Sequence, residues 1–342
     1  MRAALIALIV APFGAAFARE IVDSAGRKVE VPEKIQRVMA AGPPASVLLY
    51  MLAPEKMIGW VIRPREAVLP YLLPSVRELP EIGRLTGRGG TASVEGVMAA
   101  KPDLIVDFGS VTATYVSLAD RVQSQTGIPY VLIDGRFDQT AEALRLLGGI
   151  LGDGERAAQL AAHTGQILSD IDGLVQSVPE AQRPRVYLAR RADGLETGNR
   201  GSINTEIIER AGGINVVDAR RERGGLVTVS LEQVLKWNPD TIITTDRNFP
   251  AEAKSVATPL TPWAEVDAVR RGRIYLSPAL PYGWIDEPPS LNRLLGLQWL
   301  AGLFFPERYK IDIRREAKDF YRLFYQVELT DGQVDRLIEG AK

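Results

Sequence analysis

The sequence predicts an α/β protein that is built from two similar lobes. The first observation is a duplication: residues 93–106 and 230–243, which start 137 positions apart, share six of fourteen aligned residues, namely Ser, Glu, Val, Pro, Asp and Ile. Each copy has the pattern of a short helix that stops before Pro-Asp and leads into a buried strand. Repeat arrays have periods of about 20–50 residues, so one repetition at this distance indicates two lobes. A cleft between two lobes is a common place for a ligand.

The second observation is the alternation of apolar segments with helical patterns. The apolar segments are continuous, as expected for strands that are buried on both faces of a parallel sheet. The predicted strands are 37–41, 57–62, 103–108, 130–133, 185–189, 241–244 and 273–276. The predicted helices between them are 45–52, 94–99, 116–125, 205–210 and 231–236.

The third observation is a long stretch without any strand pattern, residues 139–178. Its leucines and isoleucines follow helical spacing, and Gly152-Asp153-Gly154 interrupts it. We predict one long bent helix or two collinear helices that join a first lobe, 19–138, to a second lobe with a helical tail, 179–342. A helical connection would allow only modest opening and closing of the lobes. In the tail, helices are predicted at 291–303, with Ser290 as the N-cap, at 313–325 and at 331–340.

Residues 1–18 have the pattern of a cleaved secretory signal peptide. Arg2 is followed by an apolar run, and Ala16-Phe17-Ala18 is a small-residue cleavage signature. The chain has no cysteine that could carry a lipid anchor. We therefore expect a protein exported to the periplasm and not a lipoprotein.

The composition favours binding over catalysis. The formal net charge is −1, so there is no basic surface for nucleic acid. With no cysteine and a single histidine, His163, the usual zinc and copper sites and Ser-His or Cys-His nucleophiles are not available, and we expect neither a metal site nor a cofactor. A carboxylate-dependent exported hydrolase stays open as an alternative, although no spacing selects a pair of acids.

Several motifs resemble a known family. They are the opening segment 23–32 with Arg37-Val38, the two Ser-x-Glu…Pro-Asp segments, the long central helix, Gly-Gly-Ile-Asn-Val at 212–216 and the segment 269–276. In this order they are similar to the periplasmic substrate-binding proteins of ATP-driven importers for iron complexes, haem and cobalamin. The resemblance implies two Rossmann-like lobes joined by a long backbone helix, a ligand cleft between them, and delivery of the ligand to an ABC permease with its ATPase. We expect a monomer, because both faces near the cleft must meet the permease.

The resemblance also implies that an acidic residue on each lobe pairs with arginines of the permease. The matching residues are Glu95 and Glu232, each in the first turn of its predicted helix. A simpler explanation is that each carboxylate complements the helix dipole, which is worth roughly 0.3–1 kcal/mol. The occurrence of the same residue in both copies favours docking.

Ligands of α/β sheets lie beyond the carboxyl ends of the strands, and this selects the loops there. Arginines in these loops suit carboxylates, phosphates and other oxyanions, and aromatic residues could stack on a flat ligand. The candidate ligand-binding residues are Gly42, Pro43, Arg63, Arg84, Arg88, Gly89, Gly109, Arg190, Arg200, Asn248, Tyr282 and Trp284.

The ligand class stays open between several alternatives. The main interpretation is an iron complex, such as a ferric siderophore or a related chelate, which would use the arginines and aromatic residues. A small oxyanion such as molybdate or tungstate is the alternative, because the glycine-rich loop 87–91 precedes a helix start. The segment 288–293 resembles a subgroup that includes molybdate-type binders. Cobalamin and haem remain possible within the family, whereas the lack of histidines disfavours a free divalent metal ion.

Overall fold

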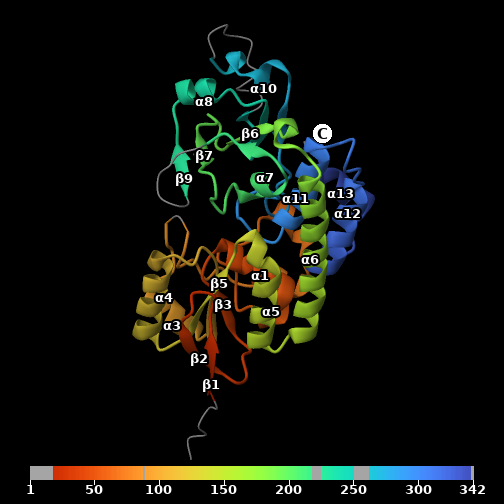
Figure 1. Ribbon diagram of the computed structural model, residues 1–342. Helices are drawn as coiled ribbons and strands as arrows, with labels where there is room; N and C mark the ends of the chain where they lie inside the picture. The colour runs from red at the N-terminus through yellow and green to blue at the C-terminus, as the bar shows by residue number, and fades with distance from the viewer. Residues whose placement is uncertain (1–17, 88, 218–224, 250–261, 340–342) are drawn as a thin grey trace, which may run out of the picture.

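The computed structural model describes residues 18–87, 89–217, 225–249 and 262–339. The predicted signal peptide, apart from Ala18, and the candidate residue Arg88 lie outside these ranges. Figure 1 shows two lobes stacked along the long axis of the molecule, with a long helix and the C-terminal helices on one side. Within the described residues, no helix combines the length and apolar composition needed to cross a bilayer.

The first lobe contains a three-stranded parallel sheet in the order β3-β4-β5. Its strands are Val38–Ala40, Leu104–Gly109 and Tyr130–Asp134, and an antiparallel hairpin of β1 and β2 (Ala18–Val22 and Lys28–Pro32) precedes them. The helices of this lobe are α1 (Pro43–Leu52), α2 (Pro74–Arg77), α3 (Val94–Ala100), α4 (Ala113–Thr126) and α5 (Thr140–Leu151). The strand predicted at 57–62 is wrong, because this segment makes only single bridges at Met57 and Trp60.

The second lobe contains a four-stranded parallel sheet in the order β11-β10-β6-β8. These strands are Ile274–Leu276, Thr241–Thr244, Arg185–Ala189 and Ile214–Asn215, and a small hairpin pairs β7 (Glu196–Gly198) with β9 (Leu226–Thr228). Its helices are α7 (Glu206–Arg210), α8 (Leu231–Trp237) and α10 (Asp267–Arg270). Two parallel sheets with helices confirm the α/β class with two lobes.

The duplicated segments form the same structure in both lobes, down to the role of the Pro-Asp pair. The Asp103 carboxylate accepts a hydrogen bond from the backbone N–H of Arg37 at 2.8 Å, where the chain enters β3. The Asp240 carboxylate accepts one from the backbone N–H of Arg185 at 3.1 Å, at the start of β6. Each aspartate therefore ties the end of its helix to the start of the neighbouring strand.

The prediction of one bent helix or two collinear helices between the lobes is wrong. α5 and α6 (Gly154–Gln176) lie side by side, and the chain reverses at Gly152, whose φ of 81° is left-handed (Figure 1). The two helices approach so closely that a Cβ on Gly148 would come within 2.1 Å of the Cβ of Ala157. The left-handed residue Gly152 turns the chain back along α5. The helix that extends along both lobes is therefore α6, and α5 does not continue it.

The C-terminal helices return to the first lobe. They are α11 (Arg293–Phe304), α12 (Ile313–Phe320) with a π-helical turn at Tyr321–Tyr325, and α13 (Asp331–Leu337). The Tyr50 hydroxyl of α1 donates to the carbonyl of Tyr325 at 2.8 Å, and the Tyr71 hydroxyl donates to the carbonyl of Gln333 at 3.2 Å. The tail that we grouped with residues 179–342 thus packs against the first lobe. One apolar cluster runs from α1 and α5 through α6 to these helices and includes Ile207 and Ile208 of the second lobe.

Ser290 is not the N-cap of the first tail helix. α11 begins at Arg293, Asn292 occupies the cap position without a side-chain cap hydrogen bond, and the buried Ser290 hydroxyl has no partner among the described residues. The chain before α11 forms a turn instead, in which the backbone N–H of Arg293 donates to the Ser290 carbonyl at 3.1 Å.

The guanidinium of Arg293 connects the two lobes. Its side chain is 2% exposed and donates to the Gly135 carbonyl of the first lobe at 2.6 Å. It also donates to the Ile203 carbonyl at 2.9 Å and to the Glu206 carboxylate at 2.6 Å, both in the second lobe. The guanidinium carbon lies 4.4 Å from the centre of the Phe137 ring. Because every partner is fixed in the folded lobes, this contact holds them in one relative position.

We predict that Arg293→Met destabilises the protein by about 3–5 kcal/mol, because it leaves the half-buried Glu206 carboxylate without its cation. Burial already raises the pKa of Glu206, and Arg293 opposes this shift. Chemical denaturation would measure the free energy of unfolding. Arg145→Met is the matched control, since Arg145 pairs with Glu142 on the exposed face of α5, where such a pair contributes about 0–1 kcal/mol. Equal losses in the two variants would contradict the role of Arg293.

Candidate ligand-binding site

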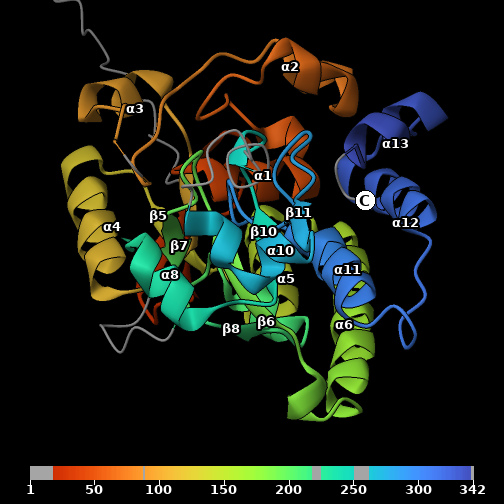
Figure 2. The same ribbon diagram turned by 90° about the horizontal axis from the view of Figure 1, so that it is seen from above.

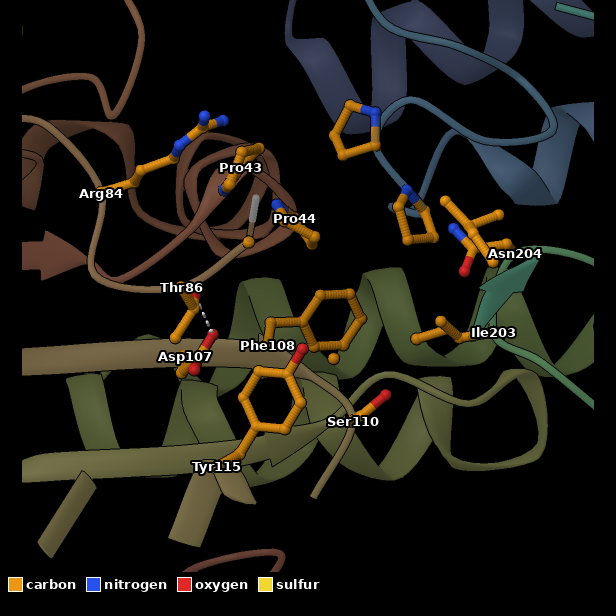
Figure 3. Close-up of a pocket in the computed structure, with 15 residues that line it drawn as sticks. Pro43, Pro44, Arg84, Thr86, Asp107, Phe108, Ser110, Tyr115, Ile203 and Asn204 are labelled. Carbon is orange, nitrogen blue, oxygen red and sulfur yellow. Dashed lines mark hydrogen bonds between the residues drawn. The ribbon is translucent and has the colours of Figure 1, made fainter. Parts of the chain in front are cut away.

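A cavity of about 480 Å³ lies between the two lobes. Residues of both lobes line it, and Figure 3 shows them around one space. The first lobe contributes Pro43, Pro44, Arg84, Thr86, Gly87, Asp107, Phe108, Gly109, Ser110 and Tyr115. The second lobe contributes Ile203, Asn204, Leu226, Pro288 and Pro289. A volume of this size falls in the range of small-molecule sites.

The first-lobe wall follows from the parallel sheet. Pro43 and Pro44 start α1 two residues after the end of β3, while Gly109 ends β4 and Ser110 follows it. Because the carboxyl ends of parallel strands meet at one edge of the sheet, these segments face the same space. The two prolines lack backbone N–H groups, so the start of α1 offers an anion fewer donors than most helix starts.

Gly42 lets the loop 84–87 lie against the start of α1. The backbone N–H groups of Leu85 and Thr86 both donate to the Ala41 carbonyl, at 2.7 and 3.0 Å. A Cβ on Gly42 would lie 2.4 Å from the Thr86 hydroxyl oxygen, so a larger residue would push this loop away. The loop in turn places Arg84 and Thr86 at the cavity.

The lining carries one cation and one acid among the residues that the structure describes, Arg84 and Asp107. The Nε of Arg84 donates to the Gly89 carbonyl at 2.9 Å, so part of its side chain is held by the backbone of its own loop. Asp107 is 5% exposed and accepts hydrogen bonds from the hydroxyls of Thr86 and Tyr130, both at 3.1 Å. Burial raises the pKa of Asp107 to about 6 against the effect of these two donors.

The remaining polar groups of the cavity are neutral. Ser110 and Tyr115 provide hydroxyls, and burial, followed by the charge of Asp107, raises the pKa of Tyr115. The amide of Asn204 is held in place by a bond of 2.9 Å from its Nδ2 to the Asp286 carboxylate. No group of three or more His, Cys, Asp or Glu residues that could hold a metal ion occurs in the described part of the chain. The arrangement can therefore hold a ligand through hydrogen bonds, one guanidinium and apolar contacts.

Three of the candidate residues lie in the cavity wall: Pro43, Arg84 and Gly109. Gly42 and Gly89 lie next to it and shape the two segments just described. Ser110 belongs to the loop 109–110, which its place at the carboxyl end of a predicted strand selects, whereas Tyr115 and Asn204 carry no separate signal in the sequence. Asp107 did carry one, since it is a charged residue inside a continuous apolar strand.

The other candidate arginines that the structure describes, Arg63, Arg190 and Arg200, are engaged away from the cavity lining. Arg63 is exposed and bonds the Glu78 carboxylate at 3.1 Å. Arg190 is buried and forms ion pairs with the carboxylates of Glu196, Asp286 and Glu287. Arg200 pairs with Glu209 at 3.3 Å. In each case the side chain bonds a carboxylate of the protein itself.

Asn248, Tyr282 and Trp284 also lie outside the cavity lining. The backbone N–H of Asn248 donates to the Asp246 carboxylate at 2.8 Å in an exposed turn. Tyr282 is partly buried beside the main apolar cluster, and burial raises the pKa of its phenol. Trp284 is 0% exposed, so its ring has no face on which a ligand could stack.

Glu95 and Glu232 occupy equivalent exposed positions on the two lobes. Ser93 caps α3 by accepting from the backbone of Gly96, and Ser230 caps α8 in the same way. The pKa of Glu95 is lowered by its own backbone N–H and then by Ser93, and that of Glu232 by Ser230 and then by its own backbone N–H. Both views place α3 and α8 on the side of the molecule that is opposite α6 and α12 (Figures 1 and 2).

Comparisons with known proteins agree with this architecture. The chain is 27% identical to the molybdate-binding protein MolA of Haemophilus influenzae, across 95% of this chain and 97% of that protein. It is 32% identical to the vitamin B12-binding protein of Salmonella typhi, but only over 44% of this chain and 54% of that protein. The structure superposes on an ABC transporter solute binding protein from Sulfurospirillum deleyianum with a TM-score of 0.83 and 29% identity, covering 94% of this chain and 99% of that one.

The sequence between residues 76 and 280 matches the family described as periplasmic binding protein. This match spans most of both lobes, including the two duplicated segments and the loops that line much of the cavity. The chain belongs to the periplasmic binding protein family, whose members bind solutes and are not enzymes.

Proposed function

We propose that this protein is the periplasmic receptor of an ABC importer and that it binds a small oxyanion of the molybdate and tungstate class between its lobes. The observation that carries this proposal is the chemistry of the cavity lining. One guanidinium and several neutral hydroxyl and amide groups converge there from both lobes. The similarity to a molybdate-binding protein over nearly the whole of both chains supports the same ligand class.

An iron complex, our main interpretation from the sequence, is the second candidate. The volume of about 480 Å³ favours it, because a tetrahedral oxyanion would fill only a small part of this space. An iron complex is disfavoured because Arg63, Arg190 and Arg200 pair with carboxylates of the protein outside the cavity lining. A chelate would have to rely on Arg84 as its cation among the described lining residues.

We also propose that the protein is exported to the periplasm and that it docks to the permease of the importer. Residues 1–18 would direct the chain to the periplasm and be removed, and the absence of cysteine argues against a lipid anchor. Glu95 and Glu232 would pair with arginines of the permease, one from each lobe. Their low pKa keeps both carboxylates charged, and such pairs at an exposed rim mainly govern approach and register. A monomer suits this role.

We predict that Arg84→Gln weakens molybdate binding roughly 10- to 100-fold, since a hydrogen bond to a charged group contributes about 1.5–3 kcal/mol. Isothermal titration calorimetry with molybdate would measure the dissociation constant. Arg63→Gln is the matched control, because Arg63 bonds Glu78 outside the cavity, and it should bind as the wild type does. Binding of a ferric siderophore without any binding of molybdate would decide for the second candidate.

We predict that Glu95→Ala combined with Glu232→Ala abolishes ligand uptake by cells while the purified variant keeps its affinity for the ligand. The two carboxylates lie outside the cavity lining, so their loss affects only the approach to the permease. The double variant Glu142→Ala, Glu155→Ala removes acids from the first turns of α5 and α6 and serves as the control. Normal uptake by the Glu95 and Glu232 double variant would disprove the docking role.

A further inference from the structure

A carboxylate in the wall of a cavity that is proposed to hold an anion needs an explanation. Asp107 lies on β4, in a strand whose other side chains are apolar, and it borders the cavity between the lobes. Figure 3 shows its side chain beside Thr86, in the same wall as Tyr115 and below Arg84. An ionised carboxylate at this place would repel an anion across a water-poor space.

The contacts of Asp107 are made with neutral groups. Its two oxygens accept from the hydroxyls of Thr86 and Tyr130, at 3.1 Å each. Neither contact supplies a positive charge, and no cation is among the groups that shift the pKa of Asp107. Both hydroxyls can rotate, so they can accommodate either a carboxylate or a neutral carboxyl group.

The elements around Asp107 hold few other charged or titratable groups. α4 contributes Tyr115, β5 contributes Tyr130, and the loop 84–87 contributes Arg84. Behind Tyr130, the guanidinium of Arg27 donates to the Tyr130 carbonyl at 2.9 Å and pairs with Asp23. Burial raises the pKa of both tyrosines, so they stay neutral at physiological pH.

Asp107 is therefore the group in this wall that changes charge near neutrality. Burial places its pKa at about 6, so most molecules carry the carboxylate at pH 7 when the cavity holds no anion. An anion in the cavity disfavours the ionised form, whereas the O–H of the neutral form can donate to an oxygen of the anion.

We propose that Asp107 takes up a proton when the oxyanion binds and that its neutral carboxyl group becomes a hydrogen-bond donor to the ligand. This inference rests on the proposed function of the cavity as an oxyanion site. It makes Asp107 a specificity-determining residue: the site favours ligands that present only acceptors, such as fully deprotonated tetrahedral oxyanions, and it couples their binding to pH.

The sign of the coupling follows from the two protonation states. The bound anion raises the pKa of Asp107 above its value in the free protein. Affinity is therefore full below a pH of about 6, where Asp107 is already protonated. It falls about tenfold for each pH unit above that, until the pKa of the bound state is reached.

Titration calorimetry of the full-length mature protein with sodium molybdate tests the proposal. The measurements are made from about pH 6.5 to about pH 8.5, where molybdate is a dianion, in two buffers that differ in ionisation enthalpy. The wild type should take up as much as one proton per molybdate, and its dissociation constant should rise about 10- to 100-fold across this range.

Two variants provide the comparison. Asp107→Asn keeps a neutral donor of the same shape, so it should bind molybdate with little change between the two ends of the pH range and take up no proton. Asp134→Asn is the matched control: Asp134 pairs with Gly109 in the register of β5 against β4, is also buried, and bonds Arg136 outside the cavity lining. It should keep the pH dependence of the wild type.

The outcomes separate this inference from the proposed function. Binding of molybdate by the wild type without proton uptake and with a constant affinity would overturn the role of Asp107 and leave the oxyanion site intact. Loss of binding by a folded Asp107→Asn protein at every pH would also overturn it, because that result would require an ionised acceptor. Failure of the wild type to bind molybdate at any pH would overturn both proposals. Should Asp107→Asn fail to fold, the proton uptake of the wild type in the two buffers still decides.

Discussion

The relative position of the two lobes depends on one buried guanidinium. Arg293 reaches the Gly135 carbonyl of the first lobe and both Ile203 and Glu206 of the second. A desolvated cation is costly unless all of its donors are satisfied, so these partners cannot separate without a large penalty. The cavity lies beside this contact, since Ile203 both accepts from Arg293 and lines the cavity. The geometry of the cavity thus follows from the same interaction that joins the lobes.

The apolar packing acts in the same direction. α11 begins at Arg293, and the helices that follow it return to α1, where Tyr50 and Tyr325 meet. The resulting cluster joins the first lobe, α6 and α7 into one packed unit. Packed interiors have few alternative arrangements, so a structure of this kind favours small adjustments around a ligand over wide opening.

The polar groups of the cavity suit binding of a ligand rather than catalysis. Its described lining contains a single acid, Asp107, and therefore no pair of acids; its other polar groups are Arg84 and neutral hydroxyl and amide groups. Asp107 stands out because it is held by two hydroxyls rather than by a cation. A group of this kind changes charge with small changes in its surroundings, which would suit the proposed oxyanion ligand.

The duplication was visible in the sequence because it is local. Ser, Glu and Pro-Asp at fixed spacing specify a capped helix, its end and the strand that follows, and both copies form that structure. The strands of the two sheets, apart from β8, were also predictable from continuous apolar segments. The strand predicted at 57–62 does not form, because the chain enters the core at Trp60 without a ladder partner. The stretch 139–178 was predicted as one bent helix or two collinear helices, whereas the left-handed residue Gly152 reverses the chain between α5 and α6. Helical periodicity carries no information about this change of direction. Only some of the candidate residues line the cavity. Pro43, Arg84 and Gly109 follow strands or lie beside a glycine-rich loop, which a sequence pattern can indicate. Arg190 and Trp284 are residue types that suit a ligand, but they are buried among partners distant in the sequence.

The sequence by itself determined the two α/β lobes, since hydrogen bonds and apolar periodicity within a short segment fix each unit. Only the tertiary structure decided which polar side chains face the cavity, because that depends on which carboxylate, carbonyl or hydroxyl from elsewhere in the chain meets each of them.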